Sequence, residues 1–282
     1  MMNLLENVGL LVSMMTGKET EVSEVKKNNG TVLHGVIIKN GELCPCIYID
    51  DLVDGEITFD SVMEIANKVV EIWESIDMTD VNVDDFFDYE KIKGNLKLRL
   101  INKNKNKETL DELPYKEFLD LAIIVIAEKR LDTGVHSLKV DYNLLEKWNK
   151  SFDEVAEVAS ANTYKEANFK SIFEMMRHDD TVRHPVASEI PDDMMYILTN
   201  GNANFGASQI CNLSLMAVIA EKLESDLIVI PSSIHEVLVA KADLDVDTVS
   251  DFVKEANADF VDEQDILSDH AYYFSRQTGW SY

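Results

Sequence analysis

The chain has 282 residues, 46% of them hydrophobic, and a formal net charge of −26 from 52 acidic and 26 basic side chains. This length can bury a sizeable core and form two or three modules. Affinity for a nucleic-acid backbone comes largely from Lys and Arg, so direct binding to DNA or RNA is not expected. The sequence has no apolar run of about 18 residues, so no membrane-spanning helix is expected either.

The N-terminal segment is apolar, but it carries Glu6 and lacks a basic n-region, so it is not expected to be a secretory signal. Its apolar residues follow helical spacing, which predicts a docking helix. They are Leu4, Leu5, Val8, Leu11, Val12 and Met15. The cysteine count is odd and low, which predicts a reducing compartment and a cytoplasmic protein.

A first α+β module is expected over residues 1–90. Asn28-Asn29-Gly30 lies between two extended runs, which is a strong hairpin signal. Cys46–Ile49 would extend this sheet. Apolar residues at helical spacing predict a helix over Phe59–Ile76, with Thr58 or Asp60 as its cap.

A second module is expected over residues 91–177. Leu96–Ile101 alternates cleanly and predicts a strand with Lys97 and Arg99 facing outward. Phe118–Ala127 is apolar throughout, and its β-branched residues favour a strand over a helix. Further helices are predicted over 141–148 and 151–163, the second with a capping box at Ser151 and Glu154, and residues 167–176 are expected to form a helix or a helical turn.

Residues 178–193 are expected to be a linker, and 194–282 a third module. Extended runs predict strands over Met194–Leu198 and Ala271–Phe274, and a hairpin from Asp226–Ile230 and Val237–Ala240. Helices are predicted over 207–223 and 246–256, with Leu213 and Phe252 counted among their buried residues. The fold class is therefore α+β, with each module a small antiparallel or mixed sheet packed by helices.

The polar tip of this last hairpin is the candidate catalytic site. Ser232, Ser233, His235 and Glu236 place hydroxyls, an imidazole and a carboxylate close together. A His beside a carboxylate can act as a base toward a hydroxyl. The alternative is that the serines satisfy turn amides and His235 begins the second strand.

A metal site is also conceivable in the linker, where His178, Asp180 and His184 supply imidazole and carboxylate ligands. Their spacing matches no standard motif. Cys44 and Cys46 lie close together but lack two further ligands nearby in the sequence. No cofactor is expected.

The charge is unevenly distributed along the chain. Residues 41–90 carry 15 acids and one base, and residues 221–270 carry 14 acids and three bases. Lys91–Lys107 lies between them and carries seven bases and no acid. Acidic and aromatic residues meet in a segment that can serve as an interaction loop, formed by Asp84, Asp85, Phe86 and Phe87. Arg276 is a further candidate, for binding an anion.

Several short sequence segments, in this order and at this spacing, resemble those of an uncharacterised bacterial family of proteins of roughly this length. The most specific are Met195–Asn200, Pro231–Glu236 (PSSIHE) and Leu267–Tyr273 (LSDHAYY). The resemblance covers most of the chain and implies an origin in anaerobic Gram-positive bacteria and their mobile elements. It implies no known reaction.

Two functions are consistent with these features. The favoured one is a non-catalytic protein whose acidic faces engage a basic protein partner, and which regulates or inhibits a nucleic-acid enzyme. The alternative is a hydrolase that uses the hairpin tip, with Arg276 binding an anion, or the His and Asp metal site.

Overall fold

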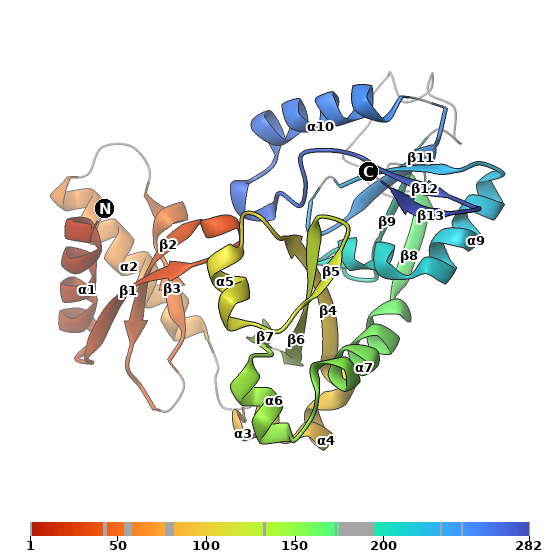
Figure 1. Cartoon of the computed structure of the whole chain (residues 1–282). Helices are drawn as coiled ribbons and strands as arrows, with labels where there is room; N and C mark the ends of the chain where they lie inside the picture. Colours follow the sequence, from red (N-terminus) through yellow and green to blue (C-terminus); the bar gives the residue numbers. More distant parts are fainter. Residues whose placement is uncertain are drawn as a thin grey trace. The chain divides into compact units, whose positions relative to one another are not determined.

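The computed structural model confirms an α+β fold with antiparallel sheets of three, four and six strands among the described residues (Figure 1). The chain divides into two compact units, one formed by residues 1–84 with 130–136 and the other by 85–129 with 137–282. The three expected module boundaries stay a prediction. The residues that the structure describes are 2–41, 44–53, 58–76, 82–131, 134–172, 174, 195–231, 233–243 and 245–281.

The first unit begins with α1 (Met2–Thr16) and the predicted hairpin of β1 (Thr20–Lys26) and β2 (Val32–Ile38). The strands are antiparallel, with Thr20 opposite Ile38 and Lys26 opposite Val32. The turn works because Asn29 and Gly30 both adopt positive φ, at 59° and 76°, which Asn and Gly tolerate best. β3 (Cys46–Tyr48) extends the sheet on the β2 side, as expected.

Two helices cover this sheet. α2 (Phe59–Ser75) begins at Thr58, whose hydroxyl accepts a hydrogen bond from the Ser61 amide in a capping box. α1 and α2 contact one another, and their apolar stripes join the inward side chains of β2 and β3 in one core. The short 3-10 turns η1 (Asn28–Gly30) and η2 (Asp50–Leu52) complete this part of the chain.

A four-stranded sheet has β6 at its centre, and its strands belong to the second unit except for their residues within 130–136. β4 (Leu96–Asn102) and β5 (Lys116–Phe118) flank β6 (Leu121–Leu131), and β7 (Gly134–Lys139) also pairs with it. α6 (Tyr142–Trp148) and α7 (Phe152–Tyr164) pack on this sheet, with Asp141 and Ser151 as caps. The short elements around it are α3 (Asp84–Phe87), α4 (Tyr89–Ile92), η3 (Lys93–Asn95) and α5 (Lys107–Glu112).

The same unit contains a six-stranded antiparallel sheet in the order β13-β12-β10-β11-β9-β8. The central hairpin is the predicted one, with Ile228 opposite Ala240. The strands are β8 (Ala167–Ser171), β9 (Met195–Asn200), β10 (Leu227–Ile230), β11 (Val237–Lys241), β12 (Tyr272–Ser275) and β13 (Gly279–Ser281). The helical segments are η5 (Gly206–Cys211), α9 (Leu213–Leu223), α10 (Val246–Phe260) and η6 (Glu263–Asp265).

Both faces of this sheet are buried, and the side chains of β10 contact a different cluster on each face. Successive side chains of a strand point to opposite faces. Leu227 and Val229 therefore join the main core with η5 and α9, whereas Ile228 joins a smaller cluster with Val249 of α10. A strand buried on both faces reads as a continuous apolar run, which explains the sequence LIVI.

Several local predictions are wrong. Residues 167–171 form the edge strand β8 rather than a helix, because they pair with β9 from Ala167–Asn200 to Ser171–Tyr196. The expected helix over 207–223 is interrupted at Asn212, which caps α9 and leaves Leu213 exposed. Arg99 does not face water, because its side chain is only 15% exposed.

Candidate functional site

The polar hairpin tip follows β10 and holds three of the four candidate catalytic residues; Ser232 lies outside the described residues. The Ser233 hydroxyl donates to Glu236 Oε1 at 3.2 Å, and the same hydroxyl oxygen accepts from the His235 amide at 3.0 Å. Serine and glutamate are therefore brought together. The contacts described for the imidazole go to other residues.

The His235 ring lies between two distant parts of the chain. Its Nδ1 accepts a hydrogen bond from the Phe205 amide at 3.1 Å, and its Nε2 lies 3.4 Å from Asp265 Oδ1. An amide can only donate, so the neutral imidazole carries its proton on Nε2. The His235 carbonyl accepts from the Gly206 amide and the Thr199 hydroxyl, both at 2.8 Å.

Through these bonds, His235 anchors the loop that leads into η5. The nitrogen with the free electron pair is already occupied, so a role as base toward Ser233 would require the Phe205 bond to break. The arrangement supports the structural interpretation of the tip. The catalytic interpretation stays a prediction.

Arg276 lies in the turn between β12 and β13, where its amide donates to Asp226 Oδ1 at 2.9 Å and its Nε lies 3.5 Å from the same oxygen. Tyr273 donates its hydroxyl to the other oxygen of Asp226 at 2.7 Å. The Arg276 amide and the Tyr273 hydroxyl hold the pKa of Asp226 below its usual value. Arg276 thus already has an anionic partner inside the protein.

The acidic-aromatic segment at 84–87 is the helix α3. Asp85 pairs with Lys91 at 3.0 Å and also with Lys129, and Lys129 and Lys91 lower its pKa. The Phe86 side chain is buried in the core, and its carbonyl accepts from the Trp148 indole at 3.1 Å. Asp84 and Phe87 are exposed, and the Lys147 ammonium lies 3.8 Å from the centre of the Phe87 ring. Asp85 and Phe86 are engaged within the fold, and a binding role for this segment stays a prediction.

The metal candidates His178, Asp180 and His184 lie outside the described residues. In the part of the chain that the structure describes, no group of three or more His, Cys, Asp or Glu is arranged to hold a metal ion. Within the same residues, no helix is long and apolar enough to cross a membrane.

The outer face of α10 combines acidic and aromatic side chains. Asp247, Asp251, Glu255 and Asp259 are spaced four residues apart and exposed, so they form one row along the helix. Phe252 lies beside this row and is 64% exposed, and Phe260 at the end of the helix is 86% exposed. The sequence prediction that Phe252 faces inward is therefore wrong. The spacing of the four acids marks the outward face and could have identified it.

A Ser–His–Asp series elsewhere in this unit was not expected from the sequence. Ser268 Oγ lies 3.3 Å from His270 Nδ1, and His270 Nε2 lies 3.6 Å from Asp120 Oδ1. Tyr272 also donates to Asp120 at 2.9 Å, from 152 residues away. Ser268 is only 1% exposed, so its hydroxyl is closed to a substrate. The series ties the segment before β12 to the β5–β6 turn.

The chain belongs to a family of unknown function, DUF5688, whose model matches residues 3–276. No curated protein and no solved structure gives a significant match. The expected membership of an uncharacterised family is confirmed, and this membership names no reaction or ligand.

Proposed function

We propose that the protein is a non-catalytic acidic binding protein that engages a basic protein partner through the outer face of α10. The observation that carries this proposal is the exposed row of Asp247, Asp251, Glu255 and Asp259 with Phe252 and Phe260 beside it. A partner that fits this face presents Lys or Arg side chains around an apolar centre.

The row is unfavourable for the isolated helix. Like charges four residues apart destabilise a helix by about 0.2–0.5 kcal/mol per pair, and the row contains successive pairs of this kind. Lys254 pairs with Asp251 at 3.2 Å, but the next two acids lie further along the helix. A cationic partner would remove this repulsion, so part of its binding energy comes from relief within α10.

The two phenylalanines are not needed to hold α10 in place. Val249 and Val253 are buried, and the Ser250 hydroxyl accepts from the Ala271 amide at 3.0 Å. The Asn257 side-chain amide donates to the Ser268 carbonyl at 2.9 Å. Phe252 and Phe260 are therefore available for a partner, and aromatic residues are enriched in the energetic centres of interfaces.

The spacing of the row also indicates the class of partner. Four residues of helix rise about 6 Å, so the row carries one charge per 6 Å. One strand of DNA carries one charge per about 3.4 Å of axis. The row therefore has the same sign of charge as a nucleic-acid strand at a lower linear charge density. It suits the basic groove of a nucleic-acid enzyme.

Inhibition of such an enzyme would fit the bacterial mobile-element setting that the sequence resemblance implies. The proposal includes a cytoplasmic location, supported by three free cysteines, Cys44, Cys46 and Cys211.

Affinity capture from native lysate at low and high salt, read by mass spectrometry, tests the proposal. One variant replaces the four acids of the α10 row by their amides. A matched control does the same on α2, at Asp60, Glu64, Glu71 and Glu74, which are also exposed. Both variants lose four negative charges, so they differ only in where the charge is removed.

We expect a basic protein that is captured at low salt and released at high salt, because exposed charges are screened. The α10 variant should lose it, and the α2 variant should keep it. A double Phe252→Ser, Phe260→Ser variant should weaken capture without changing its salt dependence. Equal capture by both charge variants, or no salt-sensitive partner at all, would refute the proposal.

A further inference from the structure

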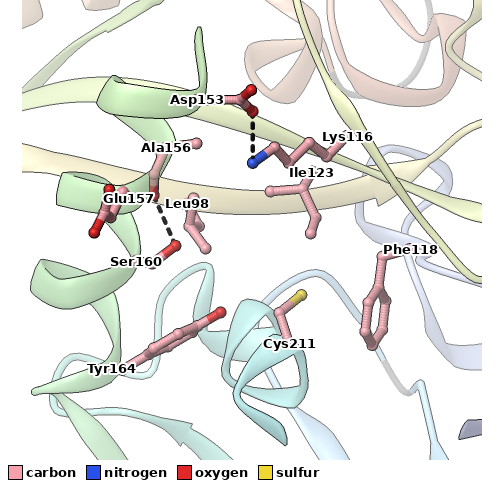
Figure 2. Close-up of a pocket in the computed structure, with 10 residues that line it drawn as sticks. All are labelled: Leu98, Lys116, Phe118, Ile123, Asp153, Ala156, Glu157, Ser160, Tyr164 and Cys211. Atoms are coloured by element: carbon pink, nitrogen blue, oxygen red, sulfur yellow. Dashed lines mark hydrogen bonds and ion pairs between the residues drawn. The ribbon is translucent and has the colours of Figure 1, made fainter.

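A pocket of about 480 Å³ lies in the second unit between α7, the four-stranded sheet and η5 (Figure 2). Its volume is in the range of small-molecule sites. One wall is apolar and is supplied by Leu98, Phe118 and Ile123 of the sheet. Ile123 packs against both main cores of this unit, so the pocket lies where the two cores meet.

The opposite wall is a row of hydrogen-bond acceptors on α7. Glu157, Ser160 and Tyr164 follow one another at spacings of three and four residues, so they share a face of the helix. The Ser160 hydroxyl donates to the Ala156 carbonyl at 2.7 Å. The Ser160 oxygen therefore keeps lone pairs for a ligand, and the Tyr164 hydroxyl oxygen can also accept a hydrogen bond.

The charge of the lining is negative. Lys116 and Asp153 pair at 2.8 Å at one end of the pocket, which leaves the Glu157 carboxylate unbalanced (Figure 2). Burial raises the pKa of Tyr164 to about 12, and burial also raises the pKa of the Cys211 thiol. Both groups are therefore neutral at physiological pH. An anionic ligand would meet one carboxylate and no free cation of the lining.

We propose that this pocket binds a small organic cation, an ammonium group carried on an aliphatic or aromatic body. The body packs on Leu98, Phe118 and Ile123, and the ammonium donates to the acceptor row on α7. An ammonium is a pure donor and therefore matches a wall of acceptors. The net charge of −26 further raises the local concentration of cations near the protein. The site is separate from the acidic row of α10 and does not depend on the proposed function.

Cys211 lines the pocket and provides a local reporter. Its alkylation by iodoacetamide is slow because burial keeps the thiol protonated, and it can be followed over a long incubation by peptide mass spectrometry in the full chain, with Cys44 and Cys46 as internal controls. Phenethylammonium, 2-phenylethanol and phenylacetate share one aromatic body and differ in charge. Each is titrated, and the concentration that halves the rate of Cys211 alkylation is measured.

Phenethylammonium should protect Cys211 at a concentration about two- to fivefold lower than 2-phenylethanol, the effect of one exposed ion pair. Phenylacetate should be the weakest. Glu157→Gln should remove the advantage of the cation and leave protection by 2-phenylethanol unchanged, which also shows that the variant is folded. Glu146→Gln removes an exposed charge of α6 outside the pocket and should keep the advantage.

Protection that is equal for the three compounds or strongest for the anion would overturn the proposal. So would an advantage of the cation that survives Glu157→Gln, or no protection by phenethylammonium at millimolar concentration.

Discussion

The guanidinium carbon of Arg99 lies 3.6 Å from the centre of the Phe205 ring. The same guanidinium donates a hydrogen bond to Glu128 at 2.6 Å. The Phe205 ring centre in turn lies 5.0 Å from the ring centre of His235. Strand β4 is thereby connected to the hairpin after β10 through one aromatic ring. Burial lowers the pKa of Arg99, and the hydrogen bond to Glu128 opposes this effect.

A double-mutant cycle at Arg99 and Phe205 should show strong coupling. Arg99→Met and Phe205→Leu each remove the cation–π contact, and both leave the backbone conformation of residue 205 in place. Because Arg99 is nearly desolvated, we expect a coupling of about 1–2 kcal/mol in the free energy of unfolding. Urea denaturation of the four proteins measures it. A coupling below about 0.3 kcal/mol, as for independent sites, would contradict this view.

Gly206 should tolerate no side chain. A Cβ at this position would lie 2.5 Å from the Asn200 amide nitrogen and 2.8 Å from the His235 carbonyl, and it would also meet the Thr199 hydroxyl. Backbone atoms cannot easily move, so Gly206→Ala should destabilise the protein by about 2 kcal/mol or more. Gly201→Ala in the same loop meets nothing within 4 Å and should change stability by less than about 0.5 kcal/mol. Thermal unfolding measures the stability of both variants.

Asp120 should contribute to acid sensitivity. Burial alone would raise its pKa, but hydrogen bonds from His270 and Tyr272 hold the pKa below its usual value. A lowered pKa in the folded state stabilises the protein above the unfolded pKa, about 3.9, and this stabilisation is lost as the pH falls through the folded value. Asp120→Asn should therefore be less stable than the native protein at pH 7, and the difference should shrink below about pH 4.

Urea denaturation at several pH values between 7 and 3 measures the Asp120 effect. Asp111→Asn, at an exposed position of α5, is the control and should show a small difference throughout. A difference for Asp120→Asn that is independent of pH would show that the lost stability does not come from its charge.

Glu255→Gln should stabilise the protein. The substitution removes repulsion with Asp251 and Asp259, each four residues away, so the free energy of unfolding should rise by about 0.4–1 kcal/mol at low salt. The gain should vanish near 1 M salt, where charges are screened over about 3 Å. Denaturation at both salt concentrations tests this. A loss of stability at low salt would mean that Glu255 makes a favourable contact within the fold.

The features that could be predicted from the sequence are those decided by neighbouring residues. Asn28-Asn29-Gly30 specifies its hairpin locally, and the capping boxes at Thr58 and Ser151 fix where two helices begin. Two of the wrong predictions, those for residues 167–171 and for Arg99, depend on distant partners. β8 is a strand because β9 offers it an edge, and Arg99 is covered because Phe205, far along the chain, reaches it.

In the candidate site, too, contacts between neighbouring residues could be predicted, whereas contacts between distant segments could not. The sequence places the Ser233 hydroxyl near the Glu236 carboxylate, because the two residues share one tight turn. It cannot show that the His235 ring bonds the Phe205 amide, nor that Tyr164 and Cys211 line a pocket with Phe118. These relationships arise only when three segments far apart in the chain pack together.

α10 is fastened to its sheet by Val249, Val253, Ser250 and Asn257, all on its inner side. None of the outward residues on its acidic row takes part in that attachment. The outer face can therefore change by mutation with little penalty to folding. Related chains are free to diverge there and acquire different partners on one unchanged scaffold, and the same helix offers a place where new specificities can be engineered.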